Sequence, residues 1–117
     1  MRIHEYNKYK NQPTVQELNL LHSNICTALG DAKRIMILYE LDNRPRNVSQ
    51  LAGDLDMPQP TVSRHLRVLR QRALVRPERD GSSVVYHLSD PRMIAILNQM
   101  RLVLRESLAR QSSFLEL

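Results

Sequence analysis

The chain has 117 residues, which suits one domain with its own hydrophobic core and leaves too little chain for a second. Seventeen lysine and arginine residues against twelve acidic ones give a net charge of +5, which favours a polyanionic partner, either nucleic acid or an anionic membrane surface. A single cysteine excludes an internal disulfide and favours a reducing, cytoplasmic compartment, and no apolar run is long enough to predict a membrane-spanning helix.

The N-terminal part of the chain divides into an arm and a first helix. Residues 1–12 are polar and basic without a sustained period, so we expect a flexible arm ahead of a domain over residues 13–117. An apolar stripe at spacings of three and four residues then predicts a first helix of about four turns. The stripe includes Leu18, Leu21 and Ile25.

Three further helices are predicted in the middle of the chain. Asp31 can cap the second helix, which ends at the breaker run over residues 43–45. Ser49 can cap a short third helix, and a fourth opens at Gln59 with Pro60 in its first turn. Because the connection between the third and fourth helices is so short, the pair indicates a helix-turn-helix.

After the fourth helix, the period of the apolar pattern changes from 3.6 to 2, which predicts strands. Asp80-Gly81 lies between the two strand-like stretches and is a strong short-range signal for a hairpin. A long last helix follows, and it is apolar on more than one face, so we expect a partner subunit to cover it. Its main apolar positions are Met93, Leu97, Met100 and Leu104.

The basic residues are concentrated on the fourth helix and the hairpin. Arginines on their outer face can neutralise phosphates while shorter polar groups on the same face reach base edges in the major groove. A solvated charged face is the alternative, but the helix-turn-helix spacing and the hairpin favour DNA. The few aromatic residues do not cluster, which favours duplex over single-stranded nucleic acid. The six arginines are Arg64, Arg67, Arg70, Arg72, Arg76 and Arg79.

Three stretches resemble the ArsR/SmtB-type winged-helix regulators: ALGDAKRIMILYEL at 28–41, VSQLAGDLDMPQPTVSRHLRVLRQRALV at 48–75 and RDGSSVVYHLSDP at 79–91. The resemblance implies a mainly α-helical winged helix-turn-helix with a small β-hairpin, about five helices and a two-stranded wing. It implies a homodimer joined by the first and last helices, acting as a repressor on a palindromic operator in double-stranded DNA and releasing it on an unidentified signal.

The resemblance also assigns the DNA-facing residues. His65 has an open alternative, which is to brace the helix inside the fold rather than contact phosphate. Ala73 replaces the family's usual glycine, and a left-handed conformation there would cost on the order of 1 kcal/mol. The recognition-helix residues are Gln59, Thr61, Ser63, Arg64, His65 and Arg67, and the wing residues are Arg79, Asp80, Gly81 and Ser82.

Many members of this family release DNA when a metal, metalloid or oxidant binds, and the known sensor positions are incomplete in this chain. We therefore expect no cofactor and no metal. One alternative is a weak site at His22 and Cys26 on the first helix, with His4 on the arm. The other is that Cys26 is buried packing and His22 is a surface or interface histidine. The arsenic-type positions hold Asn47, Ser49 and Ala52, the zinc-type positions Asp90, Arg92, Val103 and Glu106, and the dithiol positions Tyr39 and Arg105.

Three classes of function therefore compete. A sequence-specific repressor agrees best with the motifs, and a winged-helix protein-interaction or architectural module with weak nonspecific DNA binding is the alternative. An enzyme is disfavoured because the chain has no Gly-rich phosphate loop, no zinc-protease motif and no nucleophile elbow. Similar affinity for all DNA sequences would favour the protein-interaction or architectural module.

Overall fold

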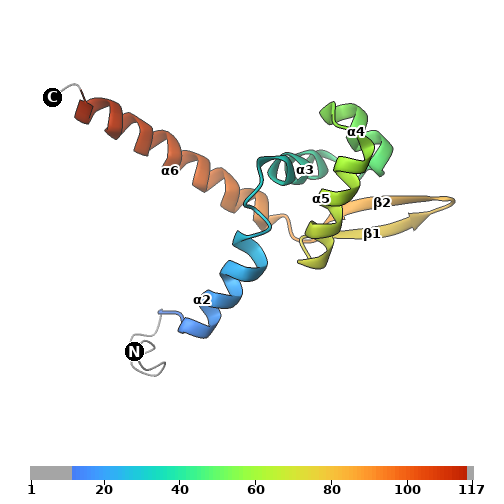
Figure 1. Cartoon of the computed structure of the whole chain (residues 1–117), viewed down its shortest axis with the longest axis horizontal. Helices are drawn as coiled ribbons and strands as arrows, with labels where there is room; N and C mark the ends of the chain where they lie inside the picture. The colour runs from blue at the N-terminus through green and yellow to red at the C-terminus, as the bar shows by residue number, and fades with distance from the viewer. Residues whose placement is uncertain (1–11, 116–117) are drawn as a thin grey trace.

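The computed structural model describes residues 12–115, so the predicted arm lies outside the described residues apart from Gln12. Helices α3, α4 and α5 form a body, α6 starts beside α3, and the hairpin β1–β2 projects from this body (Figure 1). This architecture confirms the predicted winged helix-turn-helix. The elements in chain order are α2 (Val15–Leu21), η1 (His22–Cys26), α3 (Ala32–Asn43), α4 (Val48–Leu55), α5 (Gln59–Gln71), β1 (Val75–Asp80), β2 (Ser83–Leu88) and α6 (Arg92–Leu115).

The first helical segment changes its winding part-way along. It begins where the Thr14 hydroxyl accepts a hydrogen bond from the Glu17 amide at 3.0 Å. From His22 it continues as the π-helix η1, in which the Thr27 amide donates to the His22 carbonyl five residues earlier at 3.0 Å. The predicted single α-helix was wrong in this respect, because the apolar spacing does not register one wider turn.

The N-terminal ends of α3 and α4 are capped by side chains. Asp31 caps α3 as predicted, accepting from the Lys33 amide at 2.8 Å. The cap of α4 is Asn47 and not Ser49, which lies inside the helix. Asn47 and Gln50 form a reciprocal capping box, each side chain accepting from the other's amide at 2.8 and 2.9 Å. This N-x-x-Q spacing was visible in the sequence.

The helix-turn-helix is formed by α4 and α5, which are joined by a tight turn. Asp56 turns the chain with a left-handed φ of 53°, and the Met57 amide then bonds to the Ala52 carbonyl at 3.0 Å. The inner face of α5 is fully buried against α3 and α4 and fixes the orientation of the outer face. The largest buried side chains are Ile37, Leu38, Leu51, Val62, Leu66, Leu69 and Val75.

Helix α5 ends in a Schellman motif with an unusual residue at its left-handed position. Ala73 has φ 59°, its amide bonds to the Arg70 carbonyl at 3.0 Å, and the Leu74 amide bonds to the Leu69 carbonyl at 2.9 Å. Glycine is the common residue here because it has no Cβ to strain the backbone. The left-handed conformation considered from the sequence is therefore present.

We expect Ala73→Gly to stabilise the protein by up to about 1 kcal/mol, because glycine adopts the left-handed conformation without strain. The greater conformational freedom of glycine in the unfolded chain offsets only part of this gain. Urea unfolding monitored by circular dichroism measures the change. A matched Ala52→Gly variant, inside α4, should instead destabilise the protein by a similar amount. A loss of stability in Ala73→Gly as large as that in Ala52→Gly would contradict the strain argument.

The wing is an antiparallel hairpin tied to the body. Asp80 pairs with Ser83, which leaves Gly81, with φ 63°, and Ser82 as the turn. At the other end of the hairpin, the Tyr86 amide donates to the Arg46 carbonyl at 2.9 Å and the Arg46 amide donates to the Tyr86 carbonyl at 3.3 Å. The bridge fixes the direction in which the wing leaves the body.

Arg46 also makes a buried ion-pair network that the sequence did not reveal. Its side chain is 2% exposed, and its guanidinium donates to the Glu40 carboxylate at 2.5 Å and the Asp54 carboxylate at 2.6 Å. Burial opposes the charge, but the hydrogen bonds that the guanidinium donates to these two carboxylates outweigh it and raise the pKa of Arg46. Arg46 therefore joins α3 and α4 through its side chain and the wing strand β2 through its backbone.

Helix α6 packs on the body through its first half. Met93 and Leu97 are buried in the protomer's own core, so their prediction as dimer-surface residues was wrong. Met100 and Leu104 are more than half exposed, and so is Leu108. The radius of gyration is 18.0 Å, whereas a compact chain of this length has about 13 Å, because α2 and α6 extend away from the body (Figure 1). Across residues 12–115, no helix has the length and apolar character needed to cross a membrane.

Candidate nucleic-acid interface

The outer face of α5 presents polar and basic side chains to solvent. Gln59, Ser63, Arg64 and Arg67 are exposed, and Thr61 is half-buried. Residues 63 and 64 both neighbour residue 67 on the helix surface, because they lie four and three positions before it. The opposite face carries the buried leucines of the core, so packing holds the exposed residues in a fixed direction.

His65 does not belong to this face. Its side chain is only 5% exposed, so its assignment as a DNA-facing residue was wrong: a ring buried to this extent cannot reach a phosphate. Its Nδ1 atom lies 3.3 Å from the Arg34 guanidinium. Arg34 also donates to the Ala28 carbonyl at 2.6 Å and the Thr27 carbonyl at 3.2 Å. Arg34 and His65 therefore brace α5 against the end of the first helical segment.

The brace requires a neutral imidazole, because Nδ1 has to accept the hydrogen bond from Arg34. Burial lowers the pKa of His65; Asp31 opposes this shift, and the positive charges of Arg34, Arg64 and Lys33 add to it. Because the pKa of His65 is lower in the folded protein than in the unfolded chain, where it is about 6.5, neutral His65 stabilises the fold at pH values above 6.5. This contribution is lost as the pH falls from 6.5 toward the pKa of the folded protein.

We therefore expect the wild-type protein to lose more stability between pH 7.5 and pH 5.5 than His65→Asn, by on the order of 1 kcal/mol. Asparagine retains an acceptor at the δ position for Arg34 but does not titrate in this range. Urea unfolding at both pH values measures the difference, and groups common to both proteins cancel. Identical pH dependence of the two proteins would show that His65 does not titrate through this contact.

The wing supplies a second exposed surface. Arg79, Asp80, Gly81 and Ser82 are all exposed at or beside the turn. Arg76 is engaged on the hairpin itself, since Glu78 lies 3.4 Å from it and also 3.1 Å from His87. By contrast, no ion pair joins Arg79, or the outward arginines of α5, to another residue within 12–115.

The residues weighed as metal ligands do not assemble into a site in the described part of the chain. No group of three or more His, Cys, Asp or Glu side chains placed to hold a metal occurs there. The Arg92 guanidinium donates hydrogen bonds to both carboxylate oxygens of Asp90 at 2.6 to 3.1 Å, and these hydrogen bonds lower the pKa of Asp90 to about 2. Cys26 is exposed, which contradicts the alternative that it is buried packing, whereas His22 is at the surface as that alternative expected. His4 lies outside the described residues.

Comparison with known proteins identifies relatives. The family model "Bacterial regulatory protein, arsR family" matches residues 31–76. The HTH-type transcriptional regulator KmtR of Mycobacterium tuberculosis (strain ATCC 25618 / H37Rv) is 42% identical over 62 residues, which are 53% of this chain and only 48% of KmtR. The chain therefore matches about half the length of that relative.

A second relative matches over most of both chains. The uncharacterized HTH-type transcriptional regulator Rv0081 of the same organism is 30% identical over 102 residues, 86% of this chain and 90% of Rv0081. The crystal structure of M. tuberculosis Rv0081 gives a TM-score of 0.71 at 30% identity and covers 80% of this chain and 95% of that one. The sequence match, the shared fold and the family model agree, and the chain belongs to the arsR family of bacterial regulatory proteins.

Proposed function

We propose that this protein is a transcription regulator that binds double-stranded DNA as a homodimer and represses by occluding a promoter. One observation carries the proposal: α5 holds an exposed row of polar and basic side chains, backed by a fully buried face, beside an exposed wing that carries Arg79. Its membership of a family whose relatives bear the name of HTH-type transcriptional regulators supports it.

The face of α5 supplies the chemistry that DNA recognition needs. An α-helix fits the major groove, where Arg64 can pair with guanine and Gln59 with adenine. Arg67 and Ser63 are placed to contact phosphates, which set the register of the helix but do not read sequence. Arg79 and the turn at Gly81 and Ser82 provide a second contact beside the groove.

The exposed apolar faces of α2 and α6 support assembly with a second copy. Leu18 and Leu21 are 36% and 45% exposed, and Met100 and Leu104 are 53% and 56% exposed. Apolar surface on two extended helices is costly in water unless another surface covers it. Ile25 is half-buried against the protomer's core and contributes less. A two-fold dimer would present two copies of α5 to a palindromic operator.

The DNA affinity should fall steeply with salt, with log K decreasing by about 0.9 per phosphate contact for each decade of salt. Arg64→Ala should cost about 1–3 kcal/mol on the preferred duplex and relax sequence discrimination, whereas Arg79→Ala should weaken all sequences about equally. Fluorescence anisotropy with a duplex selected from a random pool and a scrambled duplex measures both effects. Equal affinity of wild-type protein for the two duplexes would favour a nonspecific architectural module instead.

A further inference from the structure

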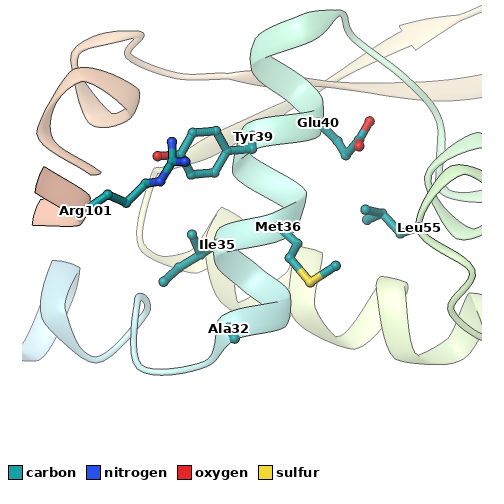
Figure 2. Close-up of a pocket in the computed structure, with 7 residues that line it drawn as sticks. All are labelled: Ala32, Ile35, Met36, Tyr39, Glu40, Leu55 and Arg101. Atoms are coloured by element: carbon teal, nitrogen blue, oxygen red, sulfur yellow. The ribbon is translucent and has the colours of Figure 1, made fainter. Parts of the chain in front are cut away.

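An apolar groove runs along the outward face of α3, between the end of α4 and the middle of α6 (Figure 2). It has a volume of about 470 Å³, within the range of small-molecule sites. Ala32, Ile35, Met36 and Tyr39 line α3 at helical spacing, and Leu55 and Arg101 stand on opposite sides. Met36 is 44% exposed, so a flexible thioether side chain borders open space.

The guanidinium of Arg101 is held in position at one side of this groove. It lies over the Tyr39 ring, 5.5 Å from the ring centroid, and donates to the Asn98 side-chain oxygen at 3.1 Å. The same oxygen accepts from the Tyr39 hydroxyl at 2.7 Å, which fixes the ring beneath the cation. No ion pair joins Arg101 to any other residue within 12–115. Arg101 therefore keeps donors available for an anion.

The one acidic residue that lines the groove does not offset this charge. Glu40 belongs to the same face of α3, but its carboxylate accepts from the buried guanidinium of Arg46 at 2.5 Å. The electrostatic character of the groove is therefore set by Arg101 at one side and by apolar side chains elsewhere. A ligand that complements it has an apolar body and one negative charge.

We propose that this groove binds a small amphipathic carboxylate. Its apolar body lies along Ile35 and Met36, and its carboxylate accepts hydrogen bonds from Arg101. The planar guanidinium suits a carboxylate because two parallel N–H donors match its two oxygens. The methionine side chain adapts to aliphatic or aromatic bodies, so the charge and the size of the ligand define the class.

The position of the groove gives the ligand a regulatory effect, and this part of the inference rests on the proposed function. The ligand would contact α3, which carries the Arg34 brace to α5, and α6, which carries the proposed dimer surface. A ligand that binds one arrangement of these helices more tightly than another shifts the population toward it. DNA affinity would then depend on the ligand.

The binding site can be tested without DNA, using the full chain labelled with ¹³C at its methionine methyl groups. The probes are 4-phenylbutyrate and the neutral 4-phenylbutanol, which share an apolar body and differ in charge. We expect the Met36 signal to shift with 4-phenylbutyrate, with half-saturation on the order of 1 mM, while the signal of buried Met93 stays in place. The alcohol should bind about tenfold more weakly because it lacks the charge-assisted hydrogen bonds.

Two variants separate recognition by Arg101 from a general effect of net charge. Arg101→Gln should weaken 4-phenylbutyrate binding about tenfold, and Arg105→Gln, on the same helix but outside the groove, should leave it unchanged. The proposal is overturned by equal binding of acid and alcohol, by an unaffected Arg101→Gln variant, or by no Met36 shift at about 10 mM acid. A change of oligomeric state in Arg101→Gln would also overturn it, because a second copy would then cover the groove.

The proposed effect of the ligand on DNA affinity is tested in a separate measurement. Saturating 4-phenylbutyrate should change the DNA affinity of the wild-type protein and leave that of Arg101→Gln unchanged. An unchanged wild-type affinity would overturn the regulatory effect. Because the methyl titration contains no DNA, a failure of DNA binding and a failure of ligand binding are seen separately.

Discussion

Replacing Glu40 and Asp54 together by Gln and Asn should lower the free energy of unfolding by about 3 kcal/mol, because the substitution leaves the Arg46 guanidinium charged, buried and unpaired. The guanidinium is 2% exposed, whereas the two carboxylates are 33% and 41% exposed. The cost therefore arises mainly from the cation. Urea unfolding at pH 7 measures it.

Arg46→Met is the matched control for this prediction. It removes the buried charge, replaces it with an aliphatic side chain and leaves two carboxylates that water can reach. We expect a smaller loss of stability than in the double amide variant, although the hydrogen bond to the Glu40 carbonyl is also removed. A larger loss in Arg46→Met would show that the packing and hydrogen bonds of Arg46 matter more than the compensation of its charge.

Leu104→Asp should abolish the dimer and lower the affinity for an operator with two half-sites by about 100-fold, since each protomer would then bind alone. Leu104 is 56% exposed in the protomer, so the change should leave the monomer folded while placing a charge in the proposed interface. Light scattering gives the oligomeric state, and fluorescence anisotropy gives the affinity.

Ala109→Asp adds the same charge to an exposed site on a different face of α6, five residues along the helix. We expect this variant to remain dimeric and to bind DNA as the wild type does. A Leu104→Asp protein that stays dimeric and binds normally would place the dimer interface elsewhere.

The fold was largely predictable because its signals are local. Helical spacing, the short turn between α4 and α5, and the Asp80-Gly81 pair each depend on residues close together in the chain. The left-handed conformation considered at Ala73 was also local, since it follows from how a helix ends. The π-helix η1 was missed because one wider turn hardly changes the apolar spacing.

The errors share a different cause, which is contact between residues far apart in sequence. Arg46 and His65 look like surface residues on composition, yet each is buried and contacts polar groups of residues far away in the sequence. The apolar stripe of α6 does not show where the body ends, so Met93 and Leu97 could not be separated from Met100 and Leu104. Exposure of Cys26 likewise depends on tertiary structure.

The groove beside Arg101 was beyond sequence reasoning for the same reason. Tyr39 and Asn98 are 59 positions apart, and only the packing of α3 on α6 brings their side chains into hydrogen-bond contact. In the sequence, Tyr39 occupies a position where dithiol sensors have a cysteine. The contact between the Tyr39 ring and the Arg101 guanidinium depends on tertiary structure.

The most direct test of DNA recognition is hydroxyl-radical footprinting of the full chain on the duplex that it selects from a random pool. Two copies of α5 in successive major grooves on one face of DNA should protect two symmetric half-sites about 34 Å apart, or a multiple of that distance. Arg64→Ala should lose the preference for this duplex over a scrambled one. Uniform protection along the DNA, with no sequence enriched from the pool, would contradict sequence-specific binding by a dimer.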